Sequence, residues 1–138
     1  MFRQFLYGKL HRCTVTRADI DYVGSISIDS DLMEAVGILP FEKVLVVNVN
    51  TGARFETYAI EAPSGSGTIG ANGGAARLVQ PGDIVLIMNF AYIGEGEVAK
   101  PKIAIIGEGN RIEAMIEEEV PVPEPFVALE SLKSKASN

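Results

Sequence analysis

Cysteine, histidine and long apolar runs are scarce in this sequence. Its 138 residues include one cysteine, Cys13, and one histidine, His11. A lone cysteine excludes a disulfide within the chain and favours a reducing compartment. No stretch approaches the roughly 20 apolar residues of a membrane helix, and Arg3, Gln4 and Lys9 interrupt the N-terminal apolar run, unlike a signal peptide. We therefore expect a cytoplasmic protein with no membrane anchor and no metal.

Acidic residues are absent before Asp19, although the whole chain has a net charge of -6. The overall charge disfavours non-specific nucleic-acid binding. The basic start, which includes Lys9, Arg12 and Arg17, can be a local anion site or the solvated charged face of a strand. Charge alone favours the solvated face, and a structural, hydrogen-bonded role is favoured for His11.

Helical periodicity is also scarce, and most of the chain has the pattern of short strands between turns rich in Gly and Pro. A capping box of Asp31 and Glu34 predicts one short helix, ending at Gly37, and a helical turn is expected over 75–78. This pattern is typical of a small closed β-barrel, formed by one domain over residues 1–115. An acidic, Pro-containing tail over 116–138 is expected to be extended or disordered. Strands are predicted over 9–17, 25–29, 43–49, 54–62, 84–90 and 102–106.

A glycine-rich loop covers residues 63–76 and contains a G-x-G-x-x-G pattern at 65–70. We reject a dinucleotide site, because that motif requires a strand before it and a sizeable helix after it. The segment 72–75 can instead present backbone N–H groups to a carboxylate or an oxyanion, for which small residues are suited. A plain surface loop remains the alternative.

The bond between Gly24 and Ser25 is a candidate for self-cleavage. A serine hydroxyl can attack the preceding carbonyl through a five-membered ring, and glycine leaves that carbonyl unshielded and tolerates strain. Elimination from the resulting ester gives dehydroalanine, which hydrolyses to a pyruvoyl group and ammonia. Taken alone, Gly-Ser is an ordinary turn dipeptide.

Motifs spread along the chain resemble the aspartate 1-decarboxylase family, whose enzymes depend on a pyruvoyl group. The similarity is close over residues 1–90, loose to about residue 110 and absent from the tail. One departure is Gly74, where the family usually has alanine. The matching segments are 8–12, 18–19, 22–25, 28–29, 37–39, 50–55, 57–60, 72–73, 75–76 and 81–85.

The resemblance implies a double-psi β-barrel that assembles as a homotetramer with active sites at subunit interfaces. It implies cleavage into chains 1–24 and 25–138, with Ser25 converted to a pyruvoyl group that forms a Schiff base with L-aspartate. The products are β-alanine, a precursor for pantothenate, and CO2. Whether cleavage needs a maturation helper protein stays open.

The resemblance also implies roles for individual residues. Tyr58 is expected to donate a proton, which suits a phenol that is neutral at pH 7. Arg54 and Lys9 are expected to bind the substrate carboxylates. Strand alternation places Thr57 and Tyr58 on opposite faces, so sharing one site requires a bulge or a subunit interface. Further expected substrate-binding residues are Thr57, Gly73, Gly74 and Ala75, and expected supporting residues are His11, Tyr22 and Asn72.

Two other readings stay open at this point. The chain could be a non-enzymatic small β-barrel, such as a binding or scaffold protein, although its charge and its shortage of basic-aromatic clusters disfavour nucleic acid as the partner. It could also be an unprocessed, inactive copy of the enzyme.

Overall fold

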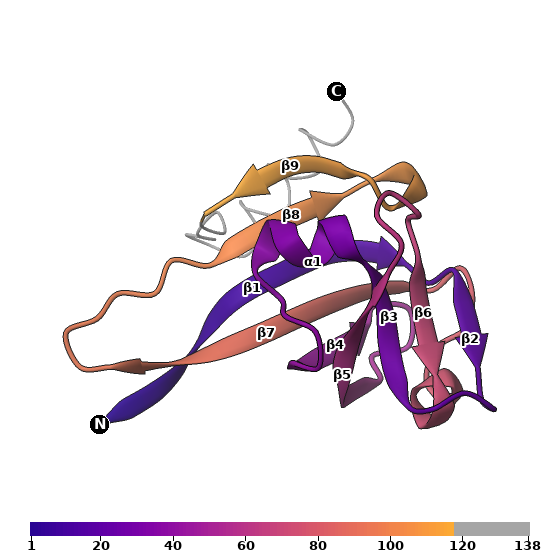
Figure 1. The fold of residues 1–138 in the computed structure, drawn as a ribbon, viewed down its shortest axis with the longest axis horizontal. Coiled ribbons are helices and arrows are strands. Elements are labelled where there is room, and N and C mark those ends of the chain that lie inside the picture. Colours follow the sequence, from indigo (N-terminus) through magenta and orange to yellow (C-terminus); the bar gives the residue numbers. More distant parts are fainter. Residues whose placement is uncertain (118–138) are drawn as a thin grey trace, which may run out of the picture.

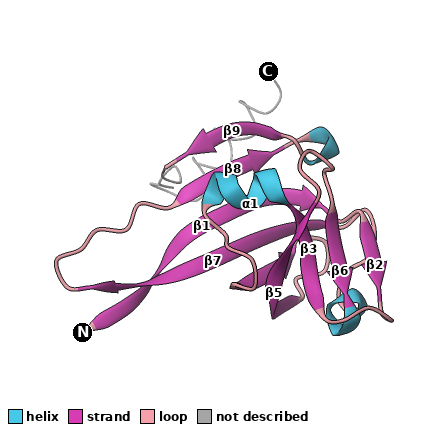
Figure 2. Ribbon diagram, in the orientation of Figure 1, coloured by secondary structure: helices cyan, strands magenta, loops and turns pink. Residues whose placement is uncertain are grey.

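The structure, a computed structural model, describes residues 1–117 and is dominated by strands (Figures 1 and 2). The elements in chain order are β1 (Phe2–Thr14), β2 (Arg17–Asp19), β3 (Ser25–Asp29), α1 (Ser30–Val36), β4 (Lys43–Asn48), β5 (Arg54–Ala62), β6 (Ile69–Asn72), the 3-10 helix η1 (Gly73–Arg77), β7 (Ile84–Gly94), β8 (Lys102–Ile106), the 3-10 helix η2 (Glu108–Asn110) and β9 (Ile112–Ile116). The prediction of a mainly β fold with little helix, consistent with a small β-barrel, is confirmed.

The strands form one mixed sheet in the order β2-β6-β3-β5-β4-β7-β1-β8-β9. The pairs β1–β8, β2–β6 and β3–β5 are parallel, and the other neighbouring pairs are antiparallel. The sheet is strongly twisted, and α1 lies against β1 and β8 (Figure 1). This order places β3, which begins at Ser25, between β5 and β6.

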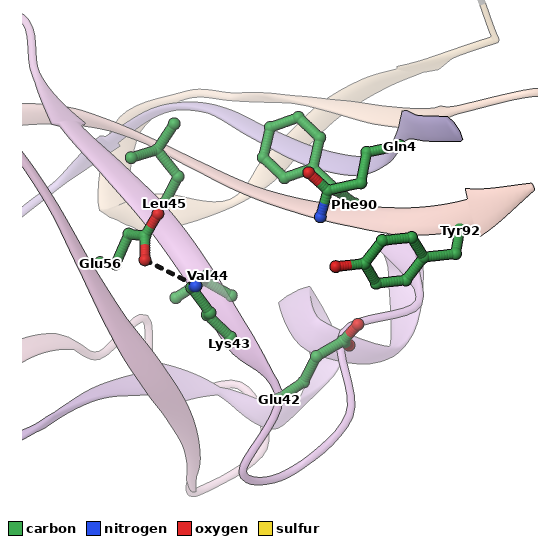
Figure 3. Close-up of a pocket in the computed structure, with 8 residues that line it drawn as sticks. All are labelled: Gln4, Glu42, Lys43, Val44, Leu45, Glu56, Phe90 and Tyr92. Atoms are coloured by element: carbon green, nitrogen blue, oxygen red, sulfur yellow. Dashed lines mark ion pairs between the residues drawn. The ribbon is translucent and has the colours of Figure 1, made fainter. Parts of the chain in front are cut away.

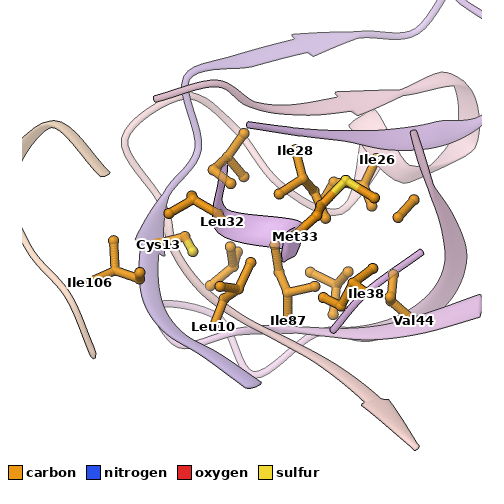
Figure 4. Close-up of a cluster of buried hydrophobic side chains, with 14 of the residues drawn as sticks. Leu10, Cys13, Ile26, Ile28, Leu32, Met33, Ile38, Val44, Ile87 and Ile106 are labelled. Atoms are coloured by element: carbon orange, nitrogen blue, oxygen red, sulfur yellow. The ribbon is translucent and has the colours of Figure 1, made fainter. Parts of the chain in front are cut away.

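The core lies between the curved sheet and α1 (Figure 4). Leu32, Met33 and Val36 form the buried face of the helix. Each such side chain stabilises the fold by roughly 1.5–3 kcal/mol relative to an exposed position. Cys13 belongs to the same core, and burial raises the pKa of its thiol to about 12, so it stays protonated and chemically inert at neutral pH.

The helix begins differently from the prediction. The N-cap is Asp29, not Asp31: the Asp29 carboxylate accepts a hydrogen bond from the backbone N–H of Asp31 at 2.9 Å. The same carboxylate accepts from the N–H groups of Gly65 and Gly67 at 3.1 and 2.9 Å. One buried side chain therefore caps α1 and anchors the glycine-rich loop, whose glycines have no side chain to do so.

Several strand boundaries also differ from the prediction. β1 starts at Phe2 because its first half pairs with the second half of β7, and the two form a long antiparallel arm (Figure 1). β2, β6 and β9 were not predicted as strands. The helical turn expected over 75–78 is a 3-10 helix that starts at Gly73. Most of the expected tail, from residue 118 onward, lies outside the described residues.

Within residues 1–117 no helix has the length and apolar character needed to cross a membrane. In the same part of the chain, no three His, Cys, Asp or Glu side chains gather in a way that could hold a metal ion.

Candidate active site

The Gly24–Ser25 bond lies where an exposed turn enters a buried strand. Ser25 is the first residue of β3, and its side chain is only 2% exposed. The preceding turn residues are open to solvent, including Tyr22 at 58% exposure. The serine hydroxyl is thus held inside the protein, while the residues before it belong to a turn that is open to solvent.

The Ser25 hydroxyl is held by two hydrogen bonds. It accepts one from the side-chain amide of Asn72 (Nδ2 to Oγ, 2.9 Å) and donates a longer one to the carbonyl of Val23, at 3.4 Å. Asn72 is fully buried at the end of β6 and is the register partner of Ser25 in the antiparallel β3–β6 pair. Its Oδ1 atom is buried and has no hydrogen-bond partner. The Asn72 amide therefore holds Ser25 through its nitrogen alone.

Gly73 allows the glycine-rich loop to pack directly on the candidate cleavage site. Its φ is +65°, and a Cβ atom there would lie 2.7 Å from the Cα and 2.9 Å from the nitrogen of Gly24. It would also lie 3.0 Å from the carbonyl oxygen of Tyr22. Because both the dihedral angle and the contact exclude a side chain, position 73 requires glycine.

The neighbouring Gly74, unlike Gly73, could be replaced by a residue with a side chain. Its φ is not positive, and a Cβ atom there would meet nothing within 4 Å. An alanine would therefore fit, so the glycine is not demanded by the fold of this loop.

A hollow of about 450 Å³ opens beside Gly24. Six of the residues predicted from the sequence line it: Gly24, Thr57, Tyr58, Asn72, Gly74 and Ala75. Thr57 and Tyr58 both line the hollow although β5 pairs with β4 without a bulge, so the bulge considered above is not needed. The parallel β3–β5 pairing, in which Ile26 faces Ala59, sets these two residues beside the start of β3.

Six of the predicted site residues do not line this hollow: Ser25, Lys9, His11, Tyr22, Arg54 and Gly73. Lys9 lies on β1 between Met88 and Ile103 and is 8% exposed. His11 is half-buried on the same strand, and Arg54 is exposed at the start of β5. Gly73 packs against Gly24 from the side of the turn, and the Tyr22 carbonyl oxygen lies beside Gly73. The hollow therefore has Gly24 in its lining, but neither of the two predicted cations, Lys9 and Arg54, lines it.

The sequence analysis missed four residues of this region. Phe55, Glu56 and Leu78 line the hollow, and Ser27 accepts a hydrogen bond from Asn72 Nδ2 at 3.0 Å. Strand alternation could have identified Ser27, because it is two residues after Ser25 and shares its face of β3. No local signal marks Leu78, which reaches the hollow only through the tertiary fold.

A second hollow, of about 300 Å³, lies over β4 and β7 (Figure 3). It contains an ion pair between Lys43 and Glu56 at 2.7 Å, and Glu56 raises the pKa of the lysine, first through a side-chain hydrogen bond. The pair is exposed and therefore contributes little to stability. None of the residues predicted for the active site lines this hollow.

A mainly β fold with a hollow of small-molecule size is consistent with a small β-barrel that binds a small molecule. A family model described as aspartate decarboxylase matches residues 1–113. The chain therefore belongs to the aspartate decarboxylase family, as its motifs predicted, and is a carboxy-lyase.

Three individual relatives are similar in sequence to this chain along most of their length. The aspartate 1-decarboxylase of Neisseria meningitidis (strain FAM18) is 53% identical over 123 residues, which cover 88% of this chain and 97% of the relative. That of Bacillus subtilis (strain 168) is 53% identical over 118 residues, covering 84% and 93%. That of Staphylococcus aureus (strain JH9) is 52% identical over 120 residues, covering 86% and 94%. The family model ends at residue 113 of this chain.

Proposed function

We propose that this chain cleaves its own Gly24–Ser25 bond and then uses the resulting pyruvoyl group to decarboxylate L-aspartate to β-alanine and CO2. Membership of the family supports the reaction and the substrate. The observation that carries the self-cleavage is the buried Ser25 hydroxyl, held by Asn72 directly after an unshielded glycine. A cytoplasmic location is part of the proposal, since Cys13, the chain's one cysteine, is a buried free thiol.

The first step converts the amide into an ester. Ser25 Oγ bonds to the carbonyl carbon of Gly24, the bond from that carbon to the Ser25 nitrogen breaks, and the hydroxyl proton passes to the nitrogen. The hydrogen bond from Asn72 holds Oγ in place for this attack, while the negative charge of the tetrahedral intermediate develops on the Gly24 carbonyl oxygen. Gly24 contributes by having no side chain over the carbonyl carbon.

The second step breaks the chain. The Cα of Ser25 loses a proton, the Cβ–Oγ bond breaks, and Oγ leaves with its electron pair as part of the Gly24 carboxylate. Because Oγ takes up negative charge as it leaves, the N–H of Asn72 stabilises it at this step. Water then replaces the nitrogen, which departs as ammonia, and chain 25–138 begins with a pyruvoyl group.

The hollow beside Gly24 suits the second function. A pyruvoyl group supplies a ketone that binds the substrate amine and withdraws electrons when the α-carboxylate leaves. We assign Tyr58 as the donor that delivers a proton to the substrate α-carbon, because this residue lines the hollow and a phenol O–H can donate a proton. Thr57 and the backbone N–H groups around Gly74 and Ala75 bind and orient the substrate.

Neither of the two predicted cations lines the hollow, and this supports an active site that is shared between two subunits. Aspartate has two carboxylates, but Lys9 and Arg54 lie outside the hollow of their own chain. Large apolar side chains are exposed on the β1–β7 arm and nearby, including Phe2 and Tyr92, each 73% exposed, and Phe41 at 76%. Such surface is typical of interfaces. We therefore propose a homotetramer in which a neighbouring subunit completes each site.

The proposal is tested by the formation of β-alanine from L-aspartate. We expect purified chain, incubated alone or with an added maturation helper, to produce β-alanine and CO2. Ser25→Ala should abolish both products, because it removes the source of the ketone. Ser66→Ala, which removes an exposed hydroxyl from the glycine-rich loop, should leave them unchanged. Full activity in folded Ser25→Ala protein would contradict the proposal.

A further inference from the structure

Ser27 shares the Asn72 amide with Ser25. Both hydroxyl oxygens accept from the same Nδ2 atom, at 2.9 Å for Ser25 and 3.0 Å for Ser27. All three side chains are buried, with exposed fractions of 2% for Ser25, 4% for Ser27 and 0% for Asn72. An NH2 group has two hydrogens in fixed directions, so these two acceptors use its full capacity.

The two hydrogen bonds determine that the nitrogen of the Asn72 side-chain amide, and not its oxygen, faces Ser25. The Oδ1 atom of Asn72 has no partner in the described chain, so the only hydrogen bonds of this side chain are those of its nitrogen. A buried acceptor without a partner is costly, which favours any rotation that would satisfy it. Two acceptors on β3 oppose that rotation, whereas Ser25 alone would hold the amide through a single hydrogen bond.

We propose that Ser27 is a positioning residue for self-cleavage: it holds the Asn72 amide so that an N–H points at Ser25 Oγ. The inference rests on the proposed function, because the oxygen that Asn72 stabilises is the one that forms and then leaves the ester. Ser27 itself takes no part in bond making or breaking.

The direct test compares two variants of nearly equal shape. Ser27→Val removes the hydroxyl, and Ser27→Thr keeps it while adding the same branching at Cβ. The readout is the rate at which intact chain is converted into its two fragments, followed by mass spectrometry. We expect Ser27→Val to cleave about tenfold more slowly than Ser27→Thr, the effect of one buried hydrogen bond. Equal rates in the two folded variants would overturn the inference.

A double-mutant cycle separates positioning from a general effect on the fold. Ser27→Ala should slow cleavage in the wild-type background but add less than about twofold to the defect of Asn72→Ala, since its effect passes through Asn72. Full additivity of the two defects would overturn the inference. If the wild-type chain itself did not cleave under any condition, the proposed function would fail first, and the two failures are thereby distinguished.

Discussion

At the scale of single residues, the two neighbouring glycines of the loop differ in what they allow. Gly73 has a positive φ and touches the Gly24 backbone, while Gly74 has neither feature. Sequence alone treats them as equal members of a glycine-rich run. The structure assigns the conformational requirement to position 73, so an alanine at position 74 is compatible with this loop.

Alanine substitutions at these positions should therefore have opposite effects on stability. Gly74→Ala should raise the free energy of unfolding by about 0.5–1 kcal/mol, because it restricts the unfolded chain and suits a helical turn. Gly73→Ala should lower it by more than about 1 kcal/mol and slow cleavage, because the methyl group would displace Gly24. Urea unfolding measures both. A Gly73→Ala protein as stable as Gly74→Ala would contradict this assignment.

Tyr58 is the residue whose proposed role is purely chemical. Tyr58→Phe keeps the ring, which packs 6.2 Å from the ring of Phe41 between centroids, and removes only the hydroxyl. We expect normal cleavage and a decrease in kcat of about 10²- to 10⁴-fold, the usual contribution of a general acid. Turnover should be measured per mole of pyruvoyl group. A kcat close to that of wild type would assign the proton to another donor.

At the scale of secondary structure, sequence patterns gave the right bounds for three of the six predicted strands. The segments 25–29, 54–62 and 102–106 are strands with the predicted bounds. β6 was missed because it lies inside the glycine-rich loop, where its pairing with β2 and β3 replaces any local propensity. The grouping of Thr57, Tyr58 and Asn72 followed from the family motifs, while the absence of Lys9 and Arg54 from the hollow depends on tertiary structure.

The N-cap of α1 was also predicted wrongly from the sequence, because Asp29 and not Asp31 caps the helix. The two aspartates can be compared by mutation. Asp29→Ala should lower the free energy of unfolding by about 3 kcal/mol, because a cap and two further backbone N–H groups lose their acceptor. Asp31→Ala should cost less than about 1 kcal/mol, since its exposed carboxylate accepts, among residues 1–117, only from the Ser64 hydroxyl. Chemical denaturation of both variants decides the point. Equal losses would restore the capping box predicted from the sequence.

At the scale of the whole molecule, a site shared between subunits predicts that two inactive chains can complement each other. Lys9→Ala chains retain Ser25 and should cleave but lack a carboxylate-binding charge, whereas Ser25→Ala chains keep Lys9 but form no pyruvoyl group. Co-expressed and co-assembled, they should regain a fraction of wild-type β-alanine formation that neither has alone. If mixed assemblies stayed as inactive as the single variants, Lys9 would not act across an interface.

The central claim is that one backbone bond is converted into the reactive group. Its most direct test is the intact mass of the assembled protein over time. The account predicts two chains, 1–24 and 25–138, whose masses together equal that of the precursor plus one water minus one ammonia. A single uncleaved chain that still turned aspartate into β-alanine would contradict it.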